Sequence, residues 1–280
     1  AGKGDLKARF DICEFETLED GLKEKPDVVF VTNPSGLHLA TAQAAVYAGC
    51  HVFIEKPLSS SEDGIDELIT AAGRQGSRIL VGYQFRFHPA LNEVKALLDG
   101  NEIGRLVSVQ MVNGEYLPDW HPYEDYSVGY AARRDLGGGV LLTQIHSFDV
   151  AYWLFGMPRQ IYAVGGHLSR LNMDVEDSVS ILMTYATEYG SVPVSVQLDY
   201  LQKPPSRTMT IVGDQGRIDW DAFANTLSVH RQGQDRPMIS DFSGVDRNQM
   251  FIDEMEHFLR VCRGHDKPRV GLEDAAASLR

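Results

Sequence analysis

The amino-acid sequence predicts an α/β protein of two parts: a parallel sheet flanked by helices, then an α+β region built on a large, mostly antiparallel open sheet. Two observations support this class. In residues 1–87, short continuous apolar runs alternate with helix-like segments, a pattern typical of buried parallel strands. From residue 88 onward, apolar and polar residues alternate with a period of two in many short segments between turns. We therefore expect one unit over residues 1–87 and a second over residues 88–280.

The first unit is predicted to hold three strands and two helices in alternation. The expected strands are residues 28–32, 51–54 and 79–83, and the expected helices are residues 38–48 and 61–75. The strands are continuous runs rich in β-branched and aromatic residues. Gly49 is expected to close the first helix and Ser61 to cap the second. Strands that alternate with helices across short loops indicate a parallel sheet.

The second unit is predicted to be dominated by strands. The expected strands are residues 106–112, 161–167, 179–185, 192–198, 209–212, 218–220 and 227–230. The expected helices are residues 92–98, 140–155 and 249–262, with a last one that begins near residue 271. Alternation along the strands predicts a sheet with one buried face.

The composition excludes several classes of function. The 280 residues are 43% hydrophobic, enough for a packed core, and carry a formal net charge of −13. A field of this sign repels nucleic-acid backbones and anionic lipid surfaces, so we expect no nucleic-acid and no membrane partner. The three cysteines (Cys13, Cys50 and Cys262) lie far apart, and no apolar run is long enough to span a bilayer. These features predict a cytoplasmic protein.

The first polar motif follows the first predicted strand and runs from Thr32 through Asn33 and Pro34 to His38. Open α/β sheets bind ligands at this edge. The motif also opens a helix, whose backbone N–H groups can face a phosphate or a ribose. An ordinary turn between strand and helix is the competing interpretation.

The second motif, Glu55-Lys56-Pro57, directly follows the second predicted strand. A lysine at the carboxyl end of a strand, with proline fixing the backbone after it, can point into a crevice. Such a lysine can act as an acid or a base when desolvation or neighbouring charges lower its pKa. A surface lysine paired with Glu55 is the competing interpretation.

A glycine run, Gly137-Gly138-Gly139, precedes the helix expected at residues 140–155. It permits close backbone approach to a ligand or a tight entry turn. On the helix, His146 and Asp149 are three residues apart and share one face, where the carboxylate can orient the imidazole. A capped helix with a structural histidine is the competing interpretation. The spacing fits neither a metal site nor a dinucleotide fingerprint, so no metal is expected.

Two aromatic stretches complete the set of candidate site residues. Residues 83–89 include Arg86 and lie where the two predicted units meet, and clefts form at domain junctions. Residues 116–123 include Tyr116, Trp120 and His121, residue types that stack on sugars and hydrogen-bond to them. Loop packing is the competing interpretation for both, and for the second stretch we favour a substrate role.

Taken in order, these motifs resemble the glucose–fructose oxidoreductase/inositol dehydrogenase (Gfo/Idh/MocA) family, over essentially the whole chain. The ordered set is Thr32-Asn33-Pro34…His38, Glu55-Lys56-Pro57, Arg86-Phe87…Pro89, the three glycines and His146-x-x-Asp149. The resemblance implies a Rossmann-type dinucleotide-binding domain in residues 1–87 and a substrate-binding and oligomerisation domain in residues 88–280. It implies NAD or NADP as cofactor and hydride transfer between the nicotinamide and a carbinol carbon of a sugar, nucleotide sugar or polyol. A homo-oligomer, dimer or tetramer, is also implied.

The resemblance assigns a role to each matching residue. Lys56 is expected to be the catalytic lysine beside the reacting hydroxyl, and His146 its acid/base or orienting partner. The residues expected along the cofactor are Thr32, Asn33, Pro34, His38, Glu55, Lys56 and Arg86. The residues expected to contact the substrate are Lys56, Tyr116, Trp120, His121, Gln144, His146 and Asp149. Oxidation of a carbinol also requires removal of its hydroxyl proton, which a neutral lysine or histidine can accept.

The sequence departs from the family pattern in two places. Many members carry an aspartate about one helical turn before the histidine, whereas this chain has Leu142-Thr143-Gln144 there, which leaves a pair of Lys56 and His146. Asp149 is expected to orient His146 or to anchor the helix. No Gly-x-Gly-x-x-Gly precedes the first strand, so we expect the first β-α-β unit, on the order of 30 residues, to be missing from this chain. Without it, the preference for NAD or NADP cannot be predicted.

Two alternatives stay open. Within the family, residues 116–122 and the helix after the glycine run look most like members associated with bacterial surface-sugar metabolism, and an inositol or simple-sugar dehydrogenase is the nearest competitor. In another class of function, the chain is a non-catalytic relative that binds a nucleotide or sugar as a sensor or an assembly subunit. Retention of Lys56 and His146 favours the enzyme, whereas the missing acid and glycine loop favour the non-catalytic relative.

Overall fold

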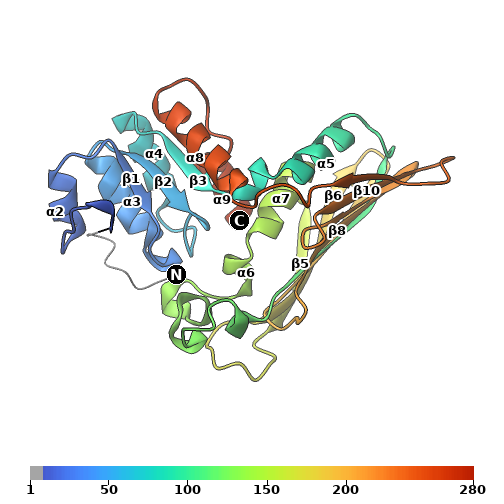
Figure 1. Ribbon diagram of the computed structural model, residues 1–280, viewed down its shortest axis with the longest axis horizontal. Helices are drawn as coiled ribbons and strands as arrows, with labels where there is room; N and C mark the ends of the chain where they lie inside the picture. Colours follow the sequence, from blue (N-terminus) through green and yellow to red (C-terminus); the bar gives the residue numbers. More distant parts are fainter. Residues whose placement is uncertain (1–8) are drawn as a thin grey trace.

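The computed structural model describes residues 9–280, and the first of its two sheets has three parallel strands (Figure 1). These strands are β1 (Val28–Val31), β2 (His51–Glu55) and β3 (Ile79–Gly82), in the order β1-β2-β3. Helices α2 (Leu18–Lys23), α3 (His38–Tyr47) and α4 (Ile65–Gln75) belong to the same part of the chain. The predicted alternation of strands and helices in a parallel sheet is therefore confirmed.

Both faces of the first sheet are covered, which explains why its strands are continuously apolar. Val31, Ile54 and Val81 pack with α3, α4 and the C-terminal helix α9 (Leu272–Leu279) on one face. On the other face, Phe53 and Leu80 pack against Phe258 of helix α8 (Gln249–Cys262). Strands buried on two faces do not need to alternate apolar and polar residues.

The second sheet has eight strands in the order β11-β10-β9-β8-β4-β7-β6-β5. Its strands are β4 (Leu106–Gly114), β5 (Gln160–Gly166), β6 (Ser178–Thr187), β7 (Gly190–Asp199), β8 (Ser206–Gly213), β9 (Gly216–Asp221), β10 (Thr226–Arg231) and β11 (Met238–Asp241). Only the β4–β7 pair among them is parallel. The expected large, mostly antiparallel sheet is confirmed. Strand β11 was not predicted, because it is a four-residue edge strand with no buried residue.

Further helices and short 3-10 turns lie between the strands of the two sheets. The remaining helices are α5 (Pro89–Asp99), α6 (Val140–Thr143) and α7 (His146–Phe155). The 3-10 turns are η1 (Ser35–Leu37), η2 (Gln84–Phe87), η3 (Leu117–Asp119), η4 (Tyr126–Val128), η5 (Tyr130–Ala132) and η6 (Arg134–Leu136). Across the described residues 9–280, no helix has the length and apolar character needed to cross a membrane.

Two predicted helices differ from the structure. The single helix expected at residues 140–155 is interrupted at Gln144 and Ile145, which divides it into α6 and α7. Helix α4 begins at Ile65 rather than at Ser61. The residue before it, Gly64, has a left-handed backbone (φ 84°), so the helix cannot extend back through it.

The C-terminal segment returns to the first sheet. The backbone N–H of Val81 in β3 donates to the carbonyl of Val270 at 3.1 Å, and α9 follows directly. Figure 1 shows α8 and α9 beside β3, although both come late in the chain. We therefore keep the division at residue 87 as a proposal for the chain's organisation, with α8 and α9 packed back across it.

The glycine run is required by close packing, of Gly137 against the first part of the chain and of Gly138 and Gly139 against residues of the second part. A Cβ on Gly137 would lie 2.8 Å from the backbone nitrogen of Gly36, and one on Gly139 would lie 2.3 Å from a Glu176 carboxylate oxygen. A Cβ on Gly138 would lie 2.3 Å from the carbonyl oxygen of Tyr130. These contacts within the chain fit the tight entry turn, one of the two interpretations of this run, and close approach to a ligand stays a prediction.

Gly138→Ala is expected to lower the free energy of unfolding by about 1–3 kcal/mol, because the rigid backbone of Tyr130 and Ala131 must move. Gly73→Ala is the matched control. Gly73 lies within α4 with nothing inside 4 Å of its added Cβ, so this change is expected to stabilise by roughly 0.5–1 kcal/mol. Urea denaturation of both variants measures the difference. Equal stabilities would contradict the close packing described for Gly138.

Candidate active site

Lys56 lies directly after β2 and reaches across to the other part of the chain. Its peptide bond to Pro57 is cis. The Nζ atom donates a hydrogen bond of 2.8 Å to the carbonyl oxygen of Thr143, the last residue of α6. Carbonyls at a helix end lack the partner that a continuing helix would supply, and the break between α6 and α7 places one here. The interruption at Gln144 therefore helps to hold the lysine.

The surroundings of Lys56 favour its neutral form. The pKa of its amine is lowered to about 8, mainly by burial and also by the charge of Arg207, while Glu55 and Glu115 act in the opposite direction. An amine with a pKa in this range changes its protonation state near neutral pH. Lys56 can therefore both accept and return a proton.

His146 begins α7 and is only 6% exposed. Its ring centroid lies 4.8 Å from that of Phe85 and 5.8 Å from that of Tyr83. Burial holds the pKa of the imidazole well below its usual value, and the charges of Lys56 and Arg207 lower it further. Its Nδ1 has no hydrogen-bond partner within residues 9–280. A neutral imidazole with an unpaired nitrogen therefore lies close to Lys56.

Asp149 pairs with Arg86 and not with His146. Arg86 donates from Nε at 2.9 Å and from Nη2 at 2.8 Å to the two carboxylate oxygens, and both side chains are buried. The guanidinium also lies over the ring of Trp153, 5.2 Å from its centroid. The predicted orientation of His146 by Asp149 is wrong, and the alternative, anchoring of the helix, describes this contact. Asp149 is fully buried and has both oxygens engaged by Arg86, which does not fit its predicted contact with the substrate. The predicted cofactor role of Arg86 stays a prediction.

His38 joins the two strand-end motifs. Its ring nitrogens lie 2.7 Å from the carbonyl oxygens of Asn33 and Pro57, and the residue is 1% exposed. A side chain enclosed in this way supports the turn and the Lys56-Pro57 loop. The structure therefore does not fit the predicted direct contact between His38 and a cofactor.

The other predicted cofactor residues lie at the carboxyl edge of the first sheet. Thr32 is exposed immediately after β1, and Pro34 precedes η1. Asn33 donates from Nδ2 to Thr41 at 2.9 Å, whereas its buried Oδ1 has no partner among the described residues. Burial raises the pKa of Glu55, whose carboxylate accepts from the backbone N–H of Lys56 at 3.2 Å.

The predicted substrate residues divide into two groups. Trp120 packs edge-on against Tyr200, with ring centroids 5.5 Å apart, and Tyr200 hydrogen-bonds to the hydroxyl of Thr143. Gln144 donates to the carbonyl of Asp199 at 3.2 Å, and its own buried Oε1 has no partner in the described part of the chain. These residues lie around the α6 end that holds Lys56.

Tyr116 and His121 lie farther toward the surface. The ammonium of Lys203 lies 5.7 Å from the ring centroid of Tyr116. His121 is exposed, and its Nδ1 lies 3.0 Å from the hydroxyl of Tyr123. The predicted contact of His121 with the substrate stays a prediction.

Sequence reasoning missed an ion pair next to the lysine. Arg207 of β8 donates from Nη2 to Glu115 at 2.6 Å and from Nε to Asn113 at 3.2 Å. The residue pattern of β8 could have indicated that Arg207 faces the core. Residues 207, 209 and 211 share one face of β8, and Met209 and Ile211 are buried core residues, so an arginine at position 207 faces the core side.

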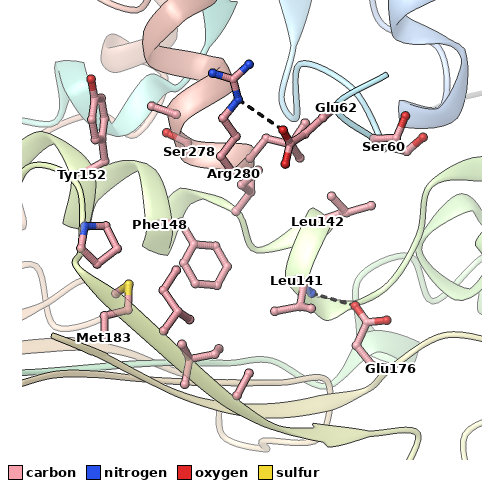
Figure 2. A pocket seen from close by; sticks show the side chains of 18 of the residues that line it. Ser60, Glu62, Leu141, Leu142, Phe148, Tyr152, Glu176, Met183, Ser278 and Arg280 are labelled. Carbon is pink, nitrogen blue, oxygen red and sulfur yellow. Dashed lines mark hydrogen bonds and ion pairs between the residues drawn. The ribbon is translucent and has the colours of Figure 1, made fainter. Parts of the chain in front are cut away.

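Two cavities flank this region. The larger, about 640 Å³, lies between α7, strands β5 and β6 and the loop after β2, and its walls are mostly apolar (Figure 2). Figure 2 shows Phe148 and Leu142 at its interior, with the Glu62–Arg280 ion pair (3.3 Å) on one side. The smaller, about 500 Å³, is lined by Gln84, Phe85 and Arg207 among others. Neither Lys56 nor His146 lines either cavity. The smaller cavity is lined by Arg207, whose charge lowers the pKa of both residues. Within residues 9–280, no cluster of three metal-ligating side chains occurs.

Comparison with known proteins identifies the family. Residues 3–83 match the family model described as "Oxidoreductase family, NAD-binding Rossmann fold", and residues 91–219 match "GFO/IDH/MocA C-terminal domain". The chain belongs to the Gfo/Idh/MocA family. Both the resemblance inferred from the motifs and the α/β class are thereby confirmed.

Relatives within the Gfo/Idh/MocA family include proteins of known and unknown activity. The chain is 28% identical over 170 residues to "Uncharacterized oxidoreductase YrbE" of Bacillus subtilis, which covers 60% of this chain and 47% of the relative. It is 27% identical over 263 residues to D-xylose 1-dehydrogenase (NADP(+)) 2 of Haloferax volcanii, covering 91% of this chain and 75% of the relative. The chain thus spans under half the length of the first relative.

A solved structure shows the same fold. Levoglucosan dehydrogenase, in complex with NADH and levoglucosan, superposes with a TM-score of 0.84 at 19% identity, covering 98% of this chain and 82% of that one. At this identity the likeness concerns the fold alone.

Proposed function

We propose that this protein is an NAD(P)-dependent oxidoreductase that transfers a hydride between the nicotinamide and a carbinol carbon of a sugar, nucleotide sugar or polyol. The observation that carries the proposal is Lys56: an amine at a strand end, with its pKa lowered to about 8 and its Nζ held by Thr143 beside a neutral His146. This arrangement suits the transfer of a hydroxyl proton.

The strand-end residues fit a dinucleotide. Asn33 presents a buried Oδ1 with no partner among the described residues, at the edge of the sheet where Rossmann folds bind their cofactor. We propose that Thr32, Asn33, Pro34, Glu55 and Lys56 lie along it, whereas His38 supports this edge from inside. NAD or NADP supplies the centre that accepts or donates the hydride.

The protein's own residues manage the proton. In alcohol oxidation, neutral Lys56 accepts the hydroxyl proton as the carbinol carbon loses its hydride, and the ammonium that forms keeps its hydrogen bond to Thr143. In carbonyl reduction the same ammonium returns the proton to the oxygen. His146, uncharged and close by, accepts or donates a hydrogen bond at that oxygen and orients it.

The pH dependence follows from the protonation state of Lys56. Because the neutral amine is the base, kcat/KM for alcohol oxidation is expected to rise with pH through about 8 and then level off. Carbonyl reduction needs the ammonium form of Lys56, so kcat/KM for reduction is expected to fall as the pH rises through the same range. Initial rates of oxidation and of reduction, measured across this pH range, test whether the two dependences are opposite.

Glu254 is the control for this profile, because burial raises the pKa of its carboxyl to about 8 as well. Glu254→Gln is expected to keep the inflection. Loss of the inflection in this variant, or a flat wild-type profile, would contradict the role given to Lys56.

We also propose a homo-oligomer, a dimer or tetramer, formed through the open face of the second sheet. Tyr162, Val164 and Leu182 lie on that face and are 58%, 79% and 42% exposed. An exposed apolar group of this kind is typical of an interface between copies. A measurement of the molar mass in solution tests this proposal, which expects the mass of two or four copies.

The experiment that tests the function is a rate screen of sugars, nucleotide sugars and polyols with NAD and NADP, followed by nicotinamide absorbance. The proposal expects turnover of at least one class with one dinucleotide. Binding of a sugar or nucleotide without any turnover would instead support a non-catalytic relative, which the absence of an acid at residues 142–144 favours.

A further inference from the structure

Arg207 presents one edge of its guanidinium that no described residue uses. Its Nε and Nη2 donate to Asn113 and Glu115 at 3.2 and 2.6 Å, which fixes the side-on edge of the group. The end-on edge, formed by Nη1 and the second hydrogen of Nη2, has no hydrogen bond within residues 9–280. A guanidinium held in this way is pre-oriented for a further partner.

This guanidinium lies at the wall of the 500 Å³ cavity and close to the proposed reacting centre. Its Cζ lies 5.1 Å from the ring centroid of Phe85, and the same ring lies 4.8 Å from the imidazole of His146. The charge of Arg207 also acts on Lys56. A ligand that contacts Arg207 from the cavity therefore lies near both proposed catalytic groups.

The unused edge of Arg207 offers two N–H donors to an anion at one side of the cavity. Arg207 and Arg247 both line it, and burial lowers the pKa of Arg207 while the neighbouring Glu115 acts in the opposite direction. Asp246 and Asp253 also line the cavity, where they accept hydrogen bonds from the backbone N–H of Asn248 and the side-chain amide of Gln249. The match to an anion therefore rests on the donors of Arg207 and not on the net charge of the lining. Two parallel N–H groups on one edge match the two oxygens of a carboxylate.

We propose that Arg207 anchors a carboxylate of the substrate, so that the preferred substrates of this oxidoreductase are sugar acids. The proposal rests on the proposed function and adds the substrate class. Arg207 is then a specificity-determining residue, while Lys56 and His146 act at the reacting carbon. Glu115 and Asn113 position the guanidinium.

The test compares matched acid and neutral substrates. Wild type, Arg207→Gln and Arg207→Lys are assayed on glucuronate with glucose, galacturonate with galactose and mannuronate with mannose, free and UDP-linked, with both dinucleotides. Arg105→Gln is the control, because it removes the same charge at an exposed ion pair with Asp214. The readout is the acid-to-neutral ratio of kcat/KM, which cancels any change common to both substrates.

The wild-type ratio is expected to exceed one for at least one pair. In Arg207→Gln that ratio is expected to fall at least about tenfold, as for loss of hydrogen bonds to a charged group. The ratio for Arg207→Lys is expected to lie between those of wild type and Arg207→Gln, because an ammonium keeps the charge but lacks the paired N–H donors of a guanidinium. Arg105→Gln is expected to keep the wild-type ratio. Circular dichroism verifies that each variant is folded.

Three results would overturn the inference. Turnover of neutral substrates with an unchanged ratio in Arg207→Gln would remove the carboxylate anchor and leave the proposed function intact. A preference for sugar phosphates over sugar acids, added as a fourth set, would assign the edge to a phosphate. No turnover of any substrate by wild type would overturn the proposed function, and the substrate class with it.

Discussion

Replacing Lys56 by methionine is expected to lower kcat by about 10²–10⁴-fold, because general acid–base transfer contributes that much to catalysis. Methionine preserves most of the side-chain volume and removes the amine that Thr143 and Glu55 surround. Dinucleotide affinity is expected to change much less than kcat, since Thr32, Asn33, Pro34 and Glu55 are also proposed to lie along the cofactor. Steady-state rates and a dinucleotide titration of the same preparation measure the two quantities separately.

Lys95→Met is the matched control for this experiment. Lys95 lies on α5 in a surface ion pair with Asp99, so its loss is expected to leave kcat unchanged. A Lys56→Met protein that binds dinucleotide and turns over at the wild-type rate would contradict the assignment of the base. Absence of turnover in the wild type as well would favour the non-catalytic relative.

Breaking the Arg86–Asp149 pair is expected to cost about 3–5 kcal/mol of folding stability, the largest stability effect we predict. In Asp149→Ala the guanidinium of Arg86 stays buried without its bidentate partner. The pair also connects η2 to α7, the helix that begins with His146. Urea denaturation measures the change in the free energy of unfolding.

The double variant Arg86→Met/Asp149→Leu is the informative comparison. It removes both charges and fills the space with apolar side chains, so it is expected to lose less stability than the sum of the single variants. Strict additivity would contradict a coupled pair. Asp149→Ala with wild-type stability would contradict the burial of the pair.

The strands were predictable because their patterns report burial directly. Residues 52–54 are apolar without interruption, and β2 is covered on both faces. In β6 Val179, Ile181 and Met183 are buried, whereas Ser180 and Leu182 between them are exposed, so one face lies on the core. The helix break at Gln144 was not predictable, because residues 140–155 read as one apolar helix, and the interruption is stabilised by tertiary contacts with Lys56 and Asp199.

The candidate site was predictable where a motif lies at a strand end. Lys56 follows β2 in the sequence itself, so its place at the edge of the sheet required no tertiary information. The partner of Asp149 is 63 residues away, and spacing along the helix favoured the wrong neighbour, His146. Glu115, the partner of Arg207, is 92 residues away in the sequence. The only sequence signal was the position of Arg207 on the face of β8 that also carries the buried Met209 and Ile211.

The most direct test of the account is a titration of the full-length gene product that carries these residues with NADH and NADPH, followed by nicotinamide fluorescence. The account predicts saturable binding of at least one dinucleotide, and a further change in signal when a sugar substrate completes the site. Binding of neither dinucleotide would contradict a cofactor site at Asn33, Glu55 and Lys56, and with it the proposed oxidoreductase activity.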